Sequence, residues 1–216
     1  KRTAAEFGLD FVEVVLPNDV DTLIADVKAL AELGARSKTD FECFWPMHYL
    51  LPRIKKAGCK LLFTGHGADS LFCMSRKATQ HYKGREDEFR DMAFSNKHAF
   101  QRHLIDATCS ELGLTYSPIF YTKTMREAFR GASQEDLHRP IEKAASRWAF
   151  PEMFERVRVY THQSFQLGDS GIQDHFLNLL ETDLNPGRKY KSTTGVFNTL
   201  VANCDSRSSS SRKGLF

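Results

Sequence analysis

The sequence contains few cysteines, and no two of them form a CxxC pair. The five cysteines are widely spaced and odd in number, which argues against a disulfide framework and against a structural zinc site. The chain also lacks a run of about 18 apolar residues, the length that a membrane-spanning helix needs. No charged-then-apolar leader opens it. We therefore expect a cytoplasmic protein that does not enter a membrane.

Neither sign of charge dominates the chain. Thirty Lys and Arg residues against 27 Asp and Glu leave a net charge of +3. So weak an excess favours neither nucleic acid nor an anionic membrane as a partner. Collagen-like, coiled-coil and wholly disordered chains are excluded as well, because 41% of the 216 residues are hydrophobic and can form a sizeable core. The length suits one globular domain, alone or with an appendage.

The first part of the chain alternates between helical and strand-like patterns. The chain opens with the end of a helix over Lys1 to Gly8 and a buried strand over Phe11 to Leu16. Two helices follow, one capped by Asn18 or Asp19 and ended by Gly34, the other opened by Pro46 and ended by Gly58. A second buried strand covers Cys59 to Thr64. Such alternation with short, glycine-punctuated joints predicts an α/β fold, with a parallel sheet and flanking helices. Because the chain begins inside a helical pattern, we expect it to start part-way through a larger fold.

Charged, aromatic-studded helical patterns replace the strand signals from about Gly84. They cover 86–113, 123–130 and 140–155. We expect a partial α/β nucleotide-binding core over 1–83, a mostly helical part over 84–187 and a C-terminal extension over 188–216. Within that extension, the tail 205–216 is rich in serine and arginine, a composition typical of disorder.

The segment after the second expected strand is the strongest local signal for function. In an open α/β sheet, ligands bind beyond the carboxyl ends of the strands. Gly65 and Gly67 would let a ligand approach the backbone closely and would expose N–H groups to an anion. Asp69 is a natural Mg²⁺ ligand beside phosphates. An ordinary strand-to-helix turn capped by Asp69 explains the same residues equally well.

Two further patterns could carry chemistry. Lys143 and Arg147 are four residues apart, so on a helix they would share one face and could neutralise a triphosphate or a developing negative charge. A solvated basic stripe is the simpler explanation of that pair. Of the eight histidines, two gain interest from their location: His66 in the loop just described, and His162 at the start of a polar loop with two glycines.

Taken in this order, the three patterns resemble the synthetase domain of the asparagine synthetase family, which includes β-lactam synthetase. Residues 64–70, Thr-Gly-His-Gly-Ala-Asp-Ser, are similar to the family's Ser-Gly-Glu-Gly-x-Asp-Glu loop. Residues 143–151 are similar to its Lys-x-x-x-Arg-x-x-Phe helix with a proline after it, and residues 162–168 to its Lys-x-x-Phe-x-x-Gly loop. Residues 105–121 look like the family segment that ends in Pro-Phe-Leu-Asp.

The resemblance implies an adenine nucleotide alpha hydrolase-like sheet and an ATP-pyrophosphatase reaction. Such an enzyme adenylates a small-molecule carboxylate with ATP and Mg²⁺, and ammonia or an amine then displaces AMP. Carried onto this sequence, the family pattern assigns nucleotide contacts to Thr64, Gly65, Gly67 and His162. It makes Asp69 the magnesium ligand, and it assigns catalytic roles to Lys143, Arg147 and His66.

The departures from the family pattern are as informative. The pyrophosphate loop Ser-Gly-Gly-x-Asp-Ser does not occur in this sequence, so we expect it on a missing N-terminal segment or a separate subunit. The family's N-terminal glutaminase domain does not occur in it either. Four family residues, Glu, Glu, Asp and Lys, are replaced by His66, Ser70, Tyr121 and His162. These changes imply a substrate other than aspartate, or a weakened or lost activity.

Two alternatives to a synthetase therefore stay open at this point. The first is a catalytically inactive binding or regulatory protein with the same fold. The second is an ATP-pyrophosphatase that acts on a nucleobase or tRNA, which would require a basic face that a net charge of +3 does not indicate. A homo-oligomer is compatible with all three readings.

Overall fold

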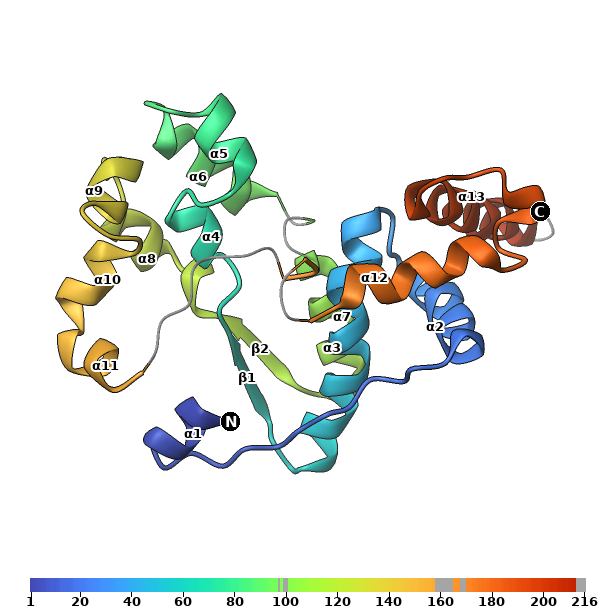
Figure 1. The fold of residues 1–216 in the computed structure, drawn as a ribbon, viewed down its shortest axis with the longest axis horizontal. Coiled ribbons are helices and arrows are strands. Elements are labelled where there is room, and N and C mark those ends of the chain that lie inside the picture. Colours follow the sequence, from blue (N-terminus) through green and yellow to red (C-terminus); the bar gives the residue numbers. More distant parts are fainter. Residues whose placement is uncertain (97, 99–100, 158–164, 168–169, 213–216) are drawn as a thin grey trace. The chain divides into compact units, whose positions relative to one another are not determined.

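The computed structural model describes residues 1–96, 98, 101–157, 165–167 and 170–212 (Figure 1). Contacts between residues divide the chain into two compact units, and each is described by itself. Unit 1 comprises Lys1–Glu13, Lys60–Arg102 and Thr115–His162, and unit 2 comprises Val14–Cys59, His103–Leu114 and Gln163–Phe216. Both units are thus assembled from separate stretches of chain, whereas the sequence predicts consecutive domains. Those consecutive boundaries stay a prediction.

Unit 1 contains a sheet of two parallel strands, β1 (Leu61–Thr64) and β2 (Thr115–Pro118) (Figure 1). Leu61 lies opposite Thr115, and Thr64 lies opposite Pro118. Parallel strands need a long crossover connection, and here the chain between them is largely helical. The predicted α/β class, with a parallel sheet, flanking helices and a mostly helical remainder, is confirmed.

The two strands that the sequence predicts to be buried turn out differently. Residues 11–16 form no strand, and the side chains of Phe11 and Val15 are 47% and 82% exposed. Strand β1 does form, but Leu61 and Phe63 are 46% and 59% exposed. A buried parallel strand needs neighbours along its edges and layers on both faces. Among the described residues the sheet consists of β1 and β2 alone, so that burial is not supplied.

Strand β2 is the element that sequence reasoning missed. Its four residues, Thr-Tyr-Ser-Pro, contain no aliphatic run that would predict a strand. Proline is tolerated at the end of such a short edge strand because its missing N–H group is not needed there. The ladder with β1 therefore decides the conformation of this segment.

Short helices make up the rest of unit 1 (Figure 1). They are α1 (Arg2–Glu6), α4 (Ala68–Leu71), α5 (Arg76–His81), α6 (Glu86–Ser95), α8 (Lys123–Ala128), α9 (Gln134–His138), α10 (Ala144–Ala149) and α11 (Pro151–Arg156), with the 3₁₀ turn η2 (Ile119–Tyr121). Side-chain caps fix several of their starts: Ser133 and Asp136 form a reciprocal capping box at α9, and Thr122 caps α8. A small apolar cluster of Cys73, Ala78 and Phe89 lies beneath Tyr82 and Met92.

The long helical pattern over 140–155 divides into α10 and α11. Helix α10 ends at Ala149, and Pro151 occupies the first position of α11. Proline cannot continue a helix because it lacks the N–H group, but its fixed φ suits the first turn of a new one. The pattern over 86–113 also divides, into α6 and α7 (Arg102–Leu112), without a proline between them.

Unit 2 is built from longer helices around a core of aromatic residues. Its elements are α2 (Val20–Leu33), α3 (Lys38–Lys56), most of α7, α12 (Ile172–Leu177), α13 (Thr193–Arg212) and the 3₁₀ turns η3 (Asn178–Glu181) and η4 (Pro186–Arg188). Phe41 of α3 stacks on Phe197 of α13 with ring centroids 4.3 Å apart. The indole N–H of Trp45 donates to Asp26 at 2.7 Å, so this buried polar atom is satisfied.

Helix α2 has the limits that the sequence predicts, whereas α3 begins earlier than predicted. Asp19 caps α2 and Gly34, with φ of 116°, ends it. Helix α3, however, begins at Lys38 rather than at Pro46, which lies inside it. Ser37 and Asp40 form a capping box at the observed start of α3. A proline inside a helix removes one backbone hydrogen bond, and the packing of α3 outweighs that loss.

Helix α13 continues to Arg212, so the described part of the expected disordered tail is helical. Extending an existing helix by one residue costs far less than starting a new one, so a serine-rich segment can continue a helix that begins in apolar sequence. None of the helices in the described ranges combines the length and the apolar composition that crossing a membrane requires.

Candidate functional site

The loop that leaves β1 is a compact turn into α4. Thr64 ends the strand, and α4 begins at Ala68 with Gly67 as its N-cap in the left-handed region, at φ of 92°. The Ala68 N–H donates to the carbonyl of Gly65 at 3.1 Å, which closes the turn. The Thr64 hydroxyl accepts from the N–H of His66 at 3.4 Å. Residues 65–69 are therefore held by the loop's own backbone.

The two glycines of the loop face different surroundings. A Cβ atom added at Gly65 would meet nothing within 4 Å, so this residue borders open space. A Cβ atom at Gly67 would lie 2.8 Å from the ring of Tyr121, so an aromatic side chain covers that residue. The N–H groups of Gly65 and Gly67 donate to no acceptor within the described part of the chain. A ligand can therefore approach the loop from the Gly65 side.

His66 points to β2 rather than to a charged partner. Its Nδ1 lies 2.9 Å from the hydroxyl of Tyr116. Burial lowers the pKa of His66, and the nearby Asp69 carboxylate opposes that effect only in part. The imidazole is consequently neutral at pH 7, so it can exchange a proton with a ligand but does not supply a positive charge.

Asp69 lies in the first turn of α4 and is half-buried. Its carboxylate forms no hydrogen bond or ion pair with any described residue. Within the ranges that the structure describes, no group of three or more His, Cys, Asp or Glu residues could hold a metal ion. One carboxylate is enough for Mg²⁺ only when phosphate oxygens supply most of the other ligands.

Tyr121 is a site residue that the sequence did not single out for a role. Its ring lies against Gly67, and the Arg102 guanidinium stacks 4.1 Å from the ring centroid. The hydroxyls of Tyr121 and Ser70 are both buried. Burial raises the pKa of the Tyr121 hydroxyl, and the Ser70 hydroxyl and the Arg102 guanidinium partly offset this. Two positions that depart from the family pattern thus lie at the same loop.

Lys143 and Arg147 do not share a helical face as the sequence predicts. Helix α10 begins at Ala144, and Lys143 precedes it as an N-cap in the left-handed region, at φ of 58°. Arg147 donates from Nε to the carbonyl of Glu142 at 3.1 Å and lies over the ring of Phe154. The two cations therefore leave the chain in different backbone conformations, because the helix starts one residue later than the pattern requires.

The remaining site predictions are not brought together by direct contact. No hydrogen bond or ion pair between described residues joins Lys143 or Arg147 to the loop of residues 64–70. The Lys143 ammonium forms no ion pair in that part of the chain either. His162, the other expected nucleotide contact, lies outside the described residues.

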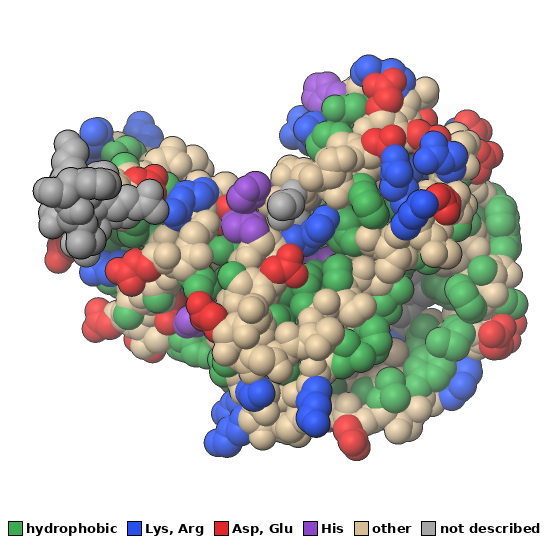
Figure 2. Space-filling model, turned by 180° about the vertical axis from the view of Figure 1, so that it is seen from behind, with side chains coloured by type: hydrophobic (Ala, Val, Ile, Leu, Met, Phe, Trp, Pro, Cys, Tyr) green, Lys and Arg blue, Asp and Glu red, His purple; other side chains and the backbone are tan. Residues whose placement is uncertain are grey.

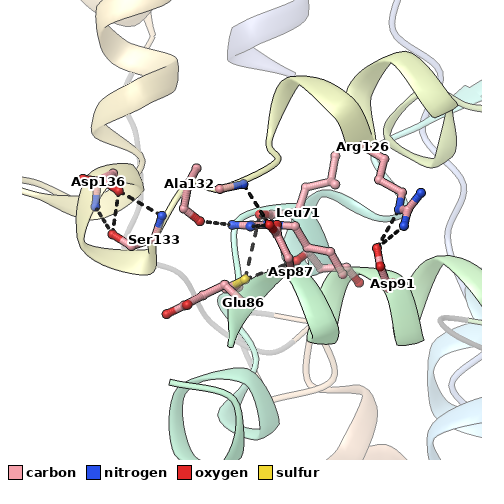
Figure 3. Close-up of polar contacts among 12 residues, drawn as sticks. Leu71, Glu86, Asp87, Asp91, Arg126, Ala132, Ser133 and Asp136 are labelled. Carbon is pink, nitrogen blue, oxygen red and sulfur yellow. Dashed lines mark hydrogen bonds and ion pairs between the residues drawn. The ribbon is translucent and has the colours of Figure 1, made fainter. Parts of the chain in front are cut away.

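A buried arginine, Arg90, contacts the residue that ends α4; its partners Leu71, Asp87 and Ala132 are labelled in Figure 3. Arg90 of α6 donates from Nε to the carbonyl of Leu71 at 2.9 Å and from Nη2 to that of Ala132 at 2.7 Å. Its Nη1 pairs with Asp87 at 2.8 Å, and Asp87 also accepts from the N–H of Gly131. Arg90 thus ties the end of α4 to the chain before α9. In the sequence it stands in a charged run, so nothing distinguished it from a solvated residue.

A comparison with protein-family models places most of the chain in a known family. The family model described as asparagine synthase matches residues 1–182. That range contains every residue of the candidate site. A search of curated proteins and a search of solved structures each gave no match.

Proposed function

Because this chain belongs to the asparagine synthase family, we propose that it carries the nucleotide-facing part of an ATP-dependent, amide-forming synthetase. The observation that supports this most directly is the loop after β1. It combines an open approach at Gly65, unused N–H groups at Gly65 and Gly67, and the unpaired carboxylate of Asp69. Those are the groups that a polyphosphate and its cation require.

The proposed reaction joins a carboxylate and an amine at the expense of ATP. A carboxylate oxygen bonds to the α-phosphorus of ATP while pyrophosphate leaves. The amine nitrogen, or ammonia, then bonds to the activated carbonyl carbon, and AMP leaves with the original carboxylate oxygen. The net change is carboxylate, ATP and amine to amide, AMP and pyrophosphate.

In this proposal the chain's own residues bind, orient and neutralise. The backbone of Thr64 and Gly65 would contact the nucleotide, and Asp69 would supply a carboxylate ligand to Mg²⁺. When bound, that cation would neutralise phosphate charge. Lys143 stabilises negative charge as the amine attacks, which its unpaired ammonium allows. Arg147 is already engaged with Glu142 and Phe154, so its contribution is to support α10.

The proposal includes a second component. The family's Ser-Gly-Gly-x-Asp-Ser pyrophosphate loop is not among these 216 residues. A preceding segment or a separate subunit would supply it. The exposed Leu61 and Phe63 of β1 offer apolar surface to such a component.

A second candidate function is a binding protein of the same fold without ATP turnover. Two observations favour it: Tyr121 covers Gly67, and the neutral His66 stands where the family has a glutamate. The histidine removes a negative charge from the loop that the synthetase mechanism uses, and Tyr121 restricts a ligand's access to it.

ATP–pyrophosphate exchange on the chain together with its pyrophosphate-loop component separates the two candidates. We expect Mg²⁺-dependent exchange that Asp69→Asn abolishes, whereas the exposed-site control Asp183→Asn leaves it unchanged. Absence of exchange with every acid offered, in a preparation that still binds ATP, would favour the binding protein. Near-normal exchange by Asp69→Asn would remove the metal assignment.

Lys143 gives a second, independent test of the synthetase. A group that acts in the transition state affects kcat more than nucleotide affinity, and loss of one such electrostatic donor costs about 10²–10³ in rate. We expect that loss for Lys143→Met and a smaller one for Arg147→Met. Unchanged kcat in Lys143→Met would contradict the assigned role.

A further inference from the structure

One histidine connects the C-terminal end of α4 with the residue before α10. His138 is the last residue of α9. Its Nε2 lies 2.7 Å from the carbonyl oxygen of Phe72, which is the C-cap of α4. Its Nδ1 lies 3.1 Å from the backbone nitrogen of Lys143. Two segments that share no direct hydrogen bond among the described residues are therefore bridged by a single imidazole.

The chemistry of the two partners fixes the state of that ring. A carbonyl oxygen can only accept, so Nε2 must carry the hydrogen. The Lys143 N–H can only donate, so Nδ1 must be bare. Only the neutral imidazole with its proton on Nε2 satisfies both contacts. The other neutral tautomer and the imidazolium would each lose at least one of them.

The hydrogen bond to Lys143 acts on an uncommon backbone conformation. Lys143 has φ of 58° and ψ of 34°, in the left-handed region that residues other than glycine rarely occupy. His138 holds the N–H of this residue while the ammonium has no ion-pair partner among the described residues. The backbone of Lys143 is thus fixed, and its side chain is left available.

The carbonyl contact acts on the other segment. Phe72 and Leu71 lie at the C-terminal end of α4, where helical carbonyls lack partners within the helix. Arg90 takes the Leu71 carbonyl and His138 takes the Phe72 carbonyl. The side chains of Arg90 and His138 therefore fix the C-terminal end of α4, the helix that follows the loop after β1.

We infer that His138 is a positioning residue, which couples the end of α4 to the backbone of Lys143. The hydrogen bonds are properties of this chain, and the consequence for rate rests on the proposed function. The competing explanation is that His138 merely packs against Phe72, whose ring centroid is 6.1 Å away.

Two conservative substitutions separate the two contacts. In His138→Asn, the side-chain oxygen can replace Nδ1 and still accept from Lys143, but nothing reaches Phe72. In His138→Gln, the amide can replace Nε2 and still donate to Phe72, but the acceptor for Lys143 is lost. His81→Gln is the matched control, since His81 is an exposed histidine in the same unit without a side-chain contact among the described residues.

Amide hydrogen exchange of the chain, followed by NMR, reads the coupling without any ligand. We expect the Lys143 amide to exchange about tenfold faster in His138→Gln, the effect of losing one hydrogen bond, and near the wild-type rate in His138→Asn. In the wild type, nitrogen-15 shifts should show a protonated Nε2 and a bare Nδ1 for His138. Equal exchange in the two variants, or the opposite tautomer, would overturn the inference.

The rate of the complete enzyme adds a functional readout. If Lys143 acts as proposed, kcat falls in His138→Gln more than in His138→Asn, with KM for ATP little changed. A role in packing alone predicts equal losses for both. Should the wild type show no ATP turnover, the proposed function fails, while the exchange pattern and the tautomer still decide the role of His138.

Discussion

The two units differ in how far they bury their own apolar side chains. Unit 2 encloses Trp45, Phe41, Phe176 and Phe197 almost completely between long helices. In unit 1 the sheet has two strands, and large hydrophobic side chains stay at the surface (Figure 2). They include Leu9, Phe11, Leu61, Phe63, Ile119, Ile141, Trp148, Phe150 and Met153. An amphipathic helix can find a partner within a small unit, but a parallel strand needs several neighbours to be covered.

This difference separates the candidate site from the best-packed core of the chain. The candidate site lies in unit 1, on a short loop and a helix start, while the well-packed core lies in unit 2. Loops on a supporting scaffold commonly carry binding residues. Polar side chains such as Arg90 and His138 replace apolar packing as the supports of the site.

The sharpest test of this comparison pairs one aromatic residue from each unit. Trp45→Ala should lower the free energy of unfolding by about 3–5 kcal/mol, because it empties a filled core. Phe63→Ala, at an exposed position of β1, should change it by about 0.5 kcal/mol or less. Urea unfolding followed by far-UV circular dichroism measures both. Comparable losses would mean that β1 is covered in solution.

The buried arginine should show that polar contacts stabilise unit 1. Arg90→Met removes the donor to two backbone carbonyls and to one oxygen of Asp87, which should cost about 3 kcal/mol. The control is Arg139→Met, which removes an exposed ion pair with Glu135 and should cost about 0.5 kcal/mol. The same unfolding measurement applies. If Arg90→Met changes the free energy of unfolding only slightly, packing rather than these polar contacts holds the end of α4.

The two loop glycines should respond unequally to a methyl group. Gly67→Ala adds strain at a positive φ and a clash with Tyr121, so we expect a loss of about 1–3 kcal/mol. Gly65→Ala meets open space and should cost little. Replacing Tyr121 by alanine in the Gly67→Ala background should recover part of the loss, because it removes the clash. Thermal unfolding of the single and double variants tests this, and strictly additive effects would contradict the contact.

The smallest expected effect is a pH dependence from His66. Burial lowers its folded-state pKa below the ordinary value of 6.5. As the pH falls through 6.5, the unfolded state takes up a proton that the folded state refuses, so stability decreases until the folded-state pKa is reached. Well above pH 6.5 both states are neutral and the effect vanishes. Stability curves between pH 5 and 8 should flatten in His66→Gln; an unchanged curve would place the titration elsewhere.

Local signals in the sequence predicted the elements that depend on neighbours in the chain. Helix α2 has its capping Asp19, its apolar spacing and its terminal Gly34 within one short segment, so its limits could be read directly. The turn after β1 was equally readable, because Gly65, Gly67 and Asp69 stand together. Capping and turn geometry involve residues three or four apart, and the sequence contains all of them.

Other features depended on residues far apart in the chain. Strand β2 exists through its ladder with β1, and residues 11–16 have the composition of a strand but no ladder. Lys143 was expected inside a helix, yet a hydrogen bond from its backbone to His138 fixes it before the helix start. Tyr121 reaches Gly67 across more than 50 residues of sequence.

The sequence by itself determined the α/β class, the loop that follows β1, and membership of a family that the order of three motifs already indicated. The tertiary structure alone decided which of the loop's glycines is open, which histidine holds Lys143, and that Arg90 is buried rather than solvated. The physical reason is the distance along the sequence over which each interaction acts. Backbone propensity and capping act within a turn of the chain, whereas burial, hydrogen-bond partners and access to a ligand depend on which distant segments fold against each other.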